Sequence, residues 1–270
     1  MSRLATLVGR SASQMRYAIA GSLALACAFQ IVLVGEAVRL ASTQSFGLLA
    51  GLLPQFLQRG LGTQLMAAAS FQGTIVFGYA HPIVCLLIPL VAMYAAMEPA
   101  HDIEARLVDL VLARPMRRGI LLTRSLLLAA LYIVVAALMT ALGTWAGVAL
   151  FHAAPYGVPS VRLILHLVWN VIALALSIAA FGLCLGSWTR RRASAFTAGA
   201  LVIVLLYIID LLAAGSPVLE ALASLSPFHY DDAFAIAAGQ AHDARDLAVL
   251  LGAAAVFSAA AFWRFGRRDL

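Results

Sequence analysis

Lysine is absent from this chain: every one of the 18 Lys+Arg residues is an arginine. A phosphate-binding loop of the form GxxxxGK[ST] needs its lysine to reach the nucleotide phosphates, so the chain carries no such loop. Schiff-base chemistry and catalysis by a lysine base are excluded for the same reason. Hydrolysis of a nucleotide by this type of loop would therefore have to take place on another chain.

Charge is scarce as well. Charged residues make up 11% of the 270 residues and hydrophobic residues 63%, against about 25% and 45–50% in soluble domains. The mean hydropathy is +0.97. A soluble fold would have to expose this apolar excess to water, and a disordered chain would be polar and charged. The composition therefore predicts an integral membrane protein.

Residue patterns typical of catalytic or metal centres are few. The three cysteines, Cys27, Cys85 and Cys184, lie singly inside apolar blocks, where we interpret them as small buried hydrophobic residues. No HExxH sequence and no pair of acids occurs inside an apolar block, and the Gly186-Ser187 pair is not part of a GxSxG sequence. We therefore expect no metal site and no catalytic activity of this chain itself. An intramembrane enzyme and a non-transporting membrane scaffold stay as alternatives.

Six apolar blocks follow one another along the chain. Each is long enough to cross the hydrocarbon layer as a helix, which takes about 20 residues. The predicted fold is a single all-α transmembrane domain over 1–270, with an interfacial helix over 1–16 and a long outer loop over 213–246. The predicted spans are Tyr17–Val34, Phe71–Met97, Leu121–Phe151, Leu163–Trp188, Ala193–Leu212 and Leu247–Trp263.

The arginines orient these six spans, because basic residues are enriched on the cytoplasmic side of membrane proteins. Three arginines precede the first span, five lie between span two and the first turn of span three, three lie at 190–192 and three follow the last span, which makes 14. The other connections hold only Arg39, Arg59, Arg162 and Arg245. This distribution places both termini in the cytoplasm. It also explains the net charge of +6 without nucleic-acid binding.

The segment 98–118, between spans two and three, is the one substantial cytoplasmic connection. Ile103, Leu107, Leu110 and Val111 recur at the spacing of one helix face. Asp102 and Arg106 are placed to form an i,i+4 pair, and Pro115 ends the helix. The pattern predicts a short amphipathic helix, which either anchors the connection at the membrane surface or docks a soluble partner.

The sequence of this segment also resembles that of a known family. An acidic start, then Asp109-Leu110-Val111-Leu112-Ala113-Arg114-Pro115-Met116-Arg117-Arg118, is similar to the coupling segment of type-2 (export-type) permeases of ABC transporters. The layout of six spans and the Leu225-Ser226-Pro227-Phe228-His229-Tyr230 sequence before the last span are also similar. The resemblance implies a coupling helix that docks a separate ATPase through Glu98, Asp102, Glu104, Arg106, Asp109, Arg114, Arg117 and Arg118.

The same resemblance implies the other components of the transporter. Members of this family work as two membrane chains with two ATPase subunits, so the chain is expected to form a homodimer or to pair with a related permease. ATP and Mg would be bound by the partner ATPase, and this chain would bind no cofactor. Membrane lipid is then the only other expected partner.

Several polar or helix-breaking residues fall inside the spans and are candidates for a path or gate. His81, Pro82 and Pro89 interrupt the second span, where they form either an ordinary kink or the wall of a cavity. Asn170 in the fourth span is expected to form a hydrogen bond between helices. Asp210, near the outer end of the fifth span, is expected to extend toward the outer surface.

His229, Asp231 and Asp232 lie close together in the outer connection before the last span. Such residues could bind a metal ion. Because Ser226-Pro227 followed by acidic residues is typical of a helix start, we favour that interpretation.

Overall fold

The computed structural model describes residues 3–43, 70–105, 119–189, 191–213, 216–237 and 244–267. The secondary structure of this part of the chain is helical throughout. It comprises α1 (Arg3–Gln14), α2 (Arg16–Ser42), α5 (Phe71–Ala80), α6 (Pro82–Cys85), α7 (Leu87–Ala96), α8 (Glu98–Glu104), α10 (Gly119–Leu150), η1 (Ala154–Tyr156), α11 (Val161–Trp188), α12 (Arg192–Leu212), α13 (Pro217–Ala223), η3 (Pro227–Tyr230), α14 (Ala233–Ala237) and α15 (Ala244–Gly266).

The six predicted spans are confirmed as helices long and apolar enough to cross a membrane. Within the described residues they are α2, the α5–α6–α7 series, α10, α11, α12 and α15. Most of the helices extend beyond the predicted bounds, because polar residues at their ends continue the helix after the apolar run has stopped. The chain therefore has the architecture of a multi-pass membrane protein.

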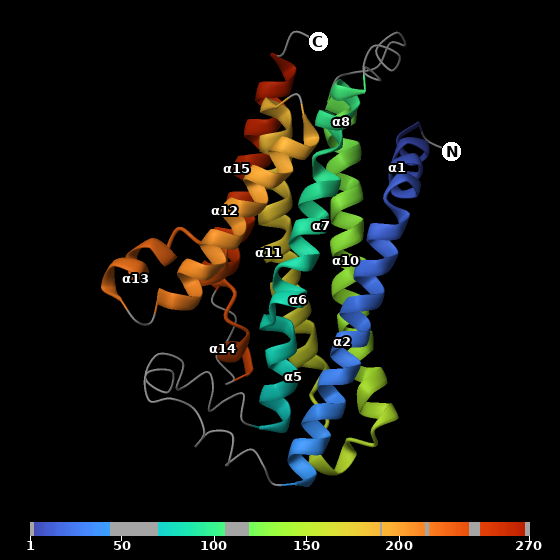
Figure 1. The fold of residues 1–270 in the computed structure, drawn as a ribbon, viewed down its shortest axis with the longest axis vertical. Helices are drawn as coiled ribbons and strands as arrows, with labels where there is room; N and C mark the ends of the chain where they lie inside the picture. Colours follow the sequence, from blue (N-terminus) through green and yellow to red (C-terminus); the bar gives the residue numbers. More distant parts are fainter. Residues whose placement is uncertain are drawn as a thin grey trace.

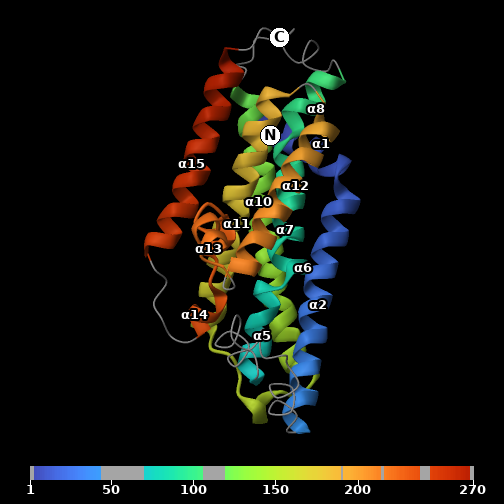
Figure 2. The same cartoon turned by 60° about the vertical axis from the view of Figure 1, so that its left-hand side comes forward.

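Helix α11 forms the centre of the bundle, with most of its apolar residues buried, whereas α2, α12 and α15 bury few of theirs. Helix α10 packs between α2 and α11, and α15 packs along the other side of α11. Figures 1 and 2 place α1, α8 and the C-terminal end of α15 at one end of the bundle, which we call the α8 end. The opposite end, with α5 and the start of α11, is called the α5 end.

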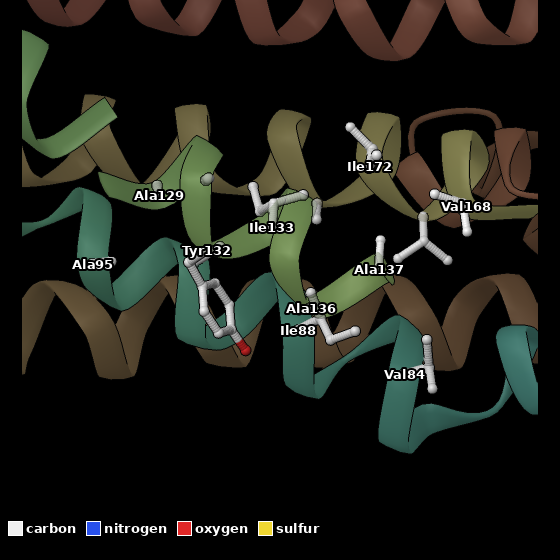
Figure 3. Packing of buried hydrophobic residues seen from close by; sticks show 14 of the residues in the cluster. Val84, Ile88, Ala95, Ala129, Tyr132, Ile133, Ala136, Ala137, Val168 and Ile172 are labelled. Atoms are coloured by element: carbon white, nitrogen blue, oxygen red, sulfur yellow. The ribbon is translucent and has the colours of Figure 1, made fainter. Parts of the chain in front are cut away.

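Small residues let the central helices approach closely. Ala129, Ala136 and Ala137 of α10 are buried in the main core cluster together with Ile88 of α7 and Ile172 of α11. Figure 3 shows this packing, with α10 between the two neighbouring helices. Burying such surfaces inside a bundle stabilises it through close van der Waals contact rather than through exclusion of water.

Exposed aromatic residues mark two levels along the bundle. Tyr17, Trp188 and Trp263 are all more than half exposed and lie on the α8-end portions of their helices. The Arg264 guanidinium lies 5.2 Å from the Trp188 ring centre. Trp169 is also exposed, and its distance along α11 from Trp188 is about 28 Å at 1.5 Å per residue. This spacing matches the thickness of a hydrocarbon layer with an aromatic belt at each side.

The second span is broken at the residues that the sequence singled out. Helix α5 ends at Ala80, because Pro82 favours an extended conformation at His81, whose φ and ψ are −72° and 143°. The His81 Nδ1 atom then accepts a hydrogen bond from the backbone N–H of Ile83 and caps α6. Pro89 lies in the first turn of α7, and the irregular residue Leu86 separates α6 from α7. A proline ring excludes a regular turn before it, which accounts for this second interruption.

Candidate functional site

Four charged side chains form a buried ion network at the α8 end. The Arg124 Nη2 atom lies 2.7 Å from the Asp102 carboxylate and 3.6 Å from that of Glu98. The Arg192 Nη1 atom lies 2.9 Å from the other oxygen of Glu98. Each of these side chains is less than one-tenth exposed. The network joins α8 to α10 and α12, and the Ser11 hydroxyl of α1 also donates to Glu98, at 3.3 Å.

Arg192 is held by further contacts from three directions. Its Nη2 atom donates to the Tyr94 carbonyl at 2.6 Å, and the guanidinium lies 3.6 Å from the centre of the Tyr94 ring. The same nitrogen is 3.6 Å from the sulfur of Met15. The backbone N–H of Arg192 donates to the Glu104 carboxylate at 3.1 Å. The first residue of α12 is therefore fixed to both ends of α8 and to α7.

The network is balanced in charge but incompletely hydrogen-bonded. Two arginines face the Glu98 and Asp102 carboxylates, so the buried formal charges cancel. Within the described part of the chain, the Nε atoms of both arginines have no acceptor, and the Glu98–Arg192 contact is an ion pair without an aligned hydrogen bond. Such a network sets a defined arrangement of helices, and removal of one partner leaves a buried charge unpaired.

These contacts change the roles expected for Glu98 and Asp102. Both were expected on a docking surface, but both are buried and their contacts lie within the chain. Asp102 pairs with Arg124 of α10. The predicted pair of Asp102 with Arg106 stays a prediction, because Arg106 lies outside the described residues. Glu104 is exposed at the end of α8. The remaining predicted docking residues also lie outside the described ranges, namely Asp109, Arg114, Arg117 and Arg118.

A second polar cluster lies where α12 ends, toward the α5 end. The Asn170 amide of α11 donates to the Asp231 carboxylate, and the Asp210 carboxylate of α12 lies 3.7 Å from His229 Nδ1. Asp232 accepts from the backbone N–H of Ala235 and caps α14. Within the described residues of the predicted outer loop over 213–246, η3 packs on α11, α12 and α15, and α14 packs on α5 and α11. Helix α13 projects to the side of the bundle from the end of α12 (Figure 1).

Burial raises the pKa of Asp231 to about 7 from its ordinary 3.8. The nearby Asp232 and Asp210 carboxylates raise it further, while the hydrogen bond from Asn170 lowers it. Asp231 therefore exchanges its proton near neutral pH.

The residues predicted for a path or gate do not form a single site. Asn170 and Asp210 both lie at the cluster around Asp231. Asn170 forms a hydrogen bond, although its partner Asp231 lies in a connection rather than on another helix. The Asp210 carboxylate faces His229. His81 lies between the rings of Phe29 and Phe77, at 4.6 and 5.3 Å between centres. Pro82 and Pro89 bend the second span beside it.

The structure also tests the two interpretations of the stretch that follows Ser226. The Ser226 hydroxyl accepts a hydrogen bond from the backbone N–H of Phe228 and caps the first turn of η3. The predicted helix start is therefore confirmed. In the described ranges, no group of three or more His, Cys, Asp or Glu side chains is placed to hold a metal ion.

A comparison with known families places the chain in one of them. The family described as "Protein of unknown function (DUF2705)" matches residues 59–270. The chain belongs to this family. No curated protein matches it. The DUF2705 region includes every charged residue of the ion network and of the Asp231 cluster, whereas α1 and α2 precede it.

From the sequence, Arg124 and Arg192 of this DUF2705 protein are interpreted only as topological signals, and Asn170 and Asp231 are named without being paired. Arg124 lies just inside the third predicted span, and Arg192 immediately precedes the fifth. For Arg124, the acids Glu98 and Asp102 directly after the preceding span are a usable signal of an internal ion pair. Nothing in the sequence pairs Asn170 with Asp231.

Proposed function

We propose that the chain is the membrane-spanning permease subunit of an ATP-driven exporter of the ABC class. In this proposal the arginine-rich α8 end faces the cytoplasm of a prokaryotic cell, and ATP and Mg are bound by a separate ATPase subunit. Two copies of the chain, or this chain and a related permease, would assemble with two ATPase subunits. The absence of lysine supports this division of roles between two chains, because a phosphate-binding loop of the form GxxxxGK[ST] needs a lysine to reach the nucleotide phosphates.

The single observation that carries the proposal is the attachment of α8 to the spans. Helix α8 begins the segment that resembles a coupling helix, and its carboxylates bind Arg124 of α10 and Arg192 of α12. A displacement of this segment by a docked ATPase would therefore move the starts of two spans directly. Packed and ion-paired elements transmit such displacements because they have discrete arrangements rather than continuous ones.

The proposed docking can be tested by purification of the tagged chain in a mild detergent. We expect a stoichiometric soluble subunit bearing GxxxxGK[ST] to co-purify, and the pair of substitutions Arg117→Glu and Arg118→Glu to remove it. Arg191→Glu is the control: it reverses the charge of one arginine in an exposed connection of the same end and should retain the subunit. The single reversals Arg117→Glu and Arg118→Glu are each compared with it. If no ATPase co-purifies while the membrane chain stays folded, a scaffold becomes the better interpretation. If both variants retain the ATPase equally, docking through Arg117 and Arg118 is wrong.

The proposed transmission to α12 gives a second test. Glu104→Ala removes the carboxylate that accepts from the N–H of Arg192, so α12 should follow a bound ATPase less. Because Glu104 is also expected to contact the ATPase, the amount of bound ATPase is measured in parallel and the signal is expressed per bound ATPase. A fluorophore at Leu212→Cys, at the other end of α12, would report this movement when ATP is added. We expect the nucleotide-dependent signal to fall to about half or less, since hydrogen bonds to charged groups contribute about 1.5–3 kcal/mol. Glu36→Ala, an exposed acid on α2, should leave it unchanged.

A further inference from the structure

The segment Ser226–Asp232, here called the wedge, is inserted into the bundle where α12 ends. It contacts α11, α12 and α15 through η3. The Ser226 hydroxyl donates to the Leu206 carbonyl at 3.2 Å, and Phe228 is 5% exposed. The Phe228 ring packs edge-to-face on Tyr207, with 5.2 Å between centres. Phe228 also belongs to the same buried cluster as Cys85 of the second span.

Acidic groups dominate the polar side of the wedge. Asp231 faces Asn170 of α11 and lies near Asp210 of α12, Asp232 of the wedge and the thiol of Cys85. The described residues of η3 and of the helices that it contacts carry further titratable or charged groups. Those within the wedge or in contact with it are His229 and Tyr230 of η3, and Tyr207 of α12. The others are Arg162, His166 and Cys184 of α11, Arg192 of α12, and Arg245, Asp246 and Arg264 of α15.

We propose that the wedge is a proton-controlled latch, which is seated between α11, α12 and α15 while Asp231 is protonated and is released when Asp231 ionises. A neutral carboxyl can still accept the hydrogen bond from Asn170 through its carbonyl oxygen. An ionised one places a negative charge next to Asp210 and Asp232 in a partly desolvated site. The seated and released states thus differ in their affinity for one proton, and pH shifts the balance between them.

The direction of the pH effect follows from the raised pKa. A carboxyl that titrates at about 7 when seated and at its ordinary 3.8 when released binds its proton more tightly in the seated state. Seating is therefore fully favoured below pH 3.8 and is lost as pH rises through about 7. From pH 6 to pH 8 the ratio of seated to released chain should fall about tenfold.

The accessibility of Cys85 provides the test, because Cys85 is 2% exposed and shares its buried cluster with Phe228. In a Cys27→Ala, Cys184→Ala background, the rate of maleimide labelling of Cys85 would be measured in phosphatidylethanolamine–phosphatidylglycerol nanodiscs at pH 6, 7 and 8. Asp231→Asn keeps the hydrogen bond and removes the titration, so it corrects for the ionisation of the thiol itself. Leu225→Cys with Cys85→Ala gives an exposed reference thiol.

We expect the labelling rate of Cys85, divided by the rate in Asp231→Asn, to rise about tenfold from pH 6 to pH 8. Phe228→Ala should raise labelling at every pH, because the wedge then lacks its buried anchor. Equal pH profiles with Asp and Asn at position 231 would overturn the proposal, as would no increase in Phe228→Ala. The measurement needs no ATPase and no transported substrate, so its outcome is independent of the proposed exporter function.

Discussion

Arg192→Met should destabilise the protein by about 3–5 kcal/mol, because it leaves the buried Glu98 carboxylate without its nearest cation. The same change removes the hydrogen bond to the Tyr94 carbonyl and the cation–π contact with the Tyr94 ring. The remaining partner, Arg124, is 3.6 Å from Glu98 and is already bound to Asp102. The free energy of unfolding would be measured by titration of the detergent-solubilised chain with sodium dodecyl sulfate.

An exposed ion pair in the same chain supplies the control. Arg39 lies 2.6 Å from Glu36 on α2, and both side chains are about half exposed or more. Arg39→Met should cost at most about 1 kcal/mol, because such pairs are solvated and screened. Arg192→Met combined with Glu98→Gln should recover part of the loss, since no unpaired buried carboxylate then remains. Equal losses in Arg192→Met and Arg39→Met would show that the buried network does not stabilise the bundle.

Gly143→Ala should separate α10 from α2 and destabilise the chain by about 1–3 kcal/mol. A Cβ atom at Gly143 would lie 2.5 Å from the Cys27 carbonyl oxygen and 3.1 Å from its Cα. These are backbone atoms of a neighbouring helix, so they cannot move aside as a flexible side chain would. Gly143→Val should cost more than Gly143→Ala, and the same unfolding titration would measure both.

Gly21→Ala on α2 is the matched control for this prediction, because no atom lies within 4 Å of the added Cβ. It should leave stability unchanged or raise it by up to about 1 kcal/mol, the difference in helix propensity between glycine and alanine. A similar response of Gly21→Ala and Gly143→Ala would contradict the close approach of α2 and α10.

The positions of the spans and of the break in the second span could be predicted from the sequence. Continuous apolar runs of about 20 residues specify helices wherever the backbone must satisfy its own hydrogen bonds. The His81-Pro82 pair specifies the end of α5 through the steric effect of proline on the preceding residue. The start of η3 at Ser226-Pro227 was predictable for a related reason, since serine caps and proline begins a helical turn.

The partners of the charged residues were decided only by the tertiary structure. A local pattern pairs Asp102 with Arg106 because i,i+4 residues are neighbours on any helix. No such pattern indicates the contact of Asp102 with Arg124, 22 positions away, which forms because α8 turns its carboxylates toward α10. Arg192 is farther still from Glu98 in the sequence, and no periodicity connects positions on different helices.

The sequence by itself therefore determined that this chain is a bundle of six apolar helices, since composition, run length and proline act locally. The tertiary structure decided which polar groups meet: Glu98 and Asp102 with two arginines at the α8 end, and Asn170 with Asp231 where α12 ends. The physical reason is that a buried charge or amide must find a partner within about 3 Å. Only the packing of whole helices determines which group is within that distance.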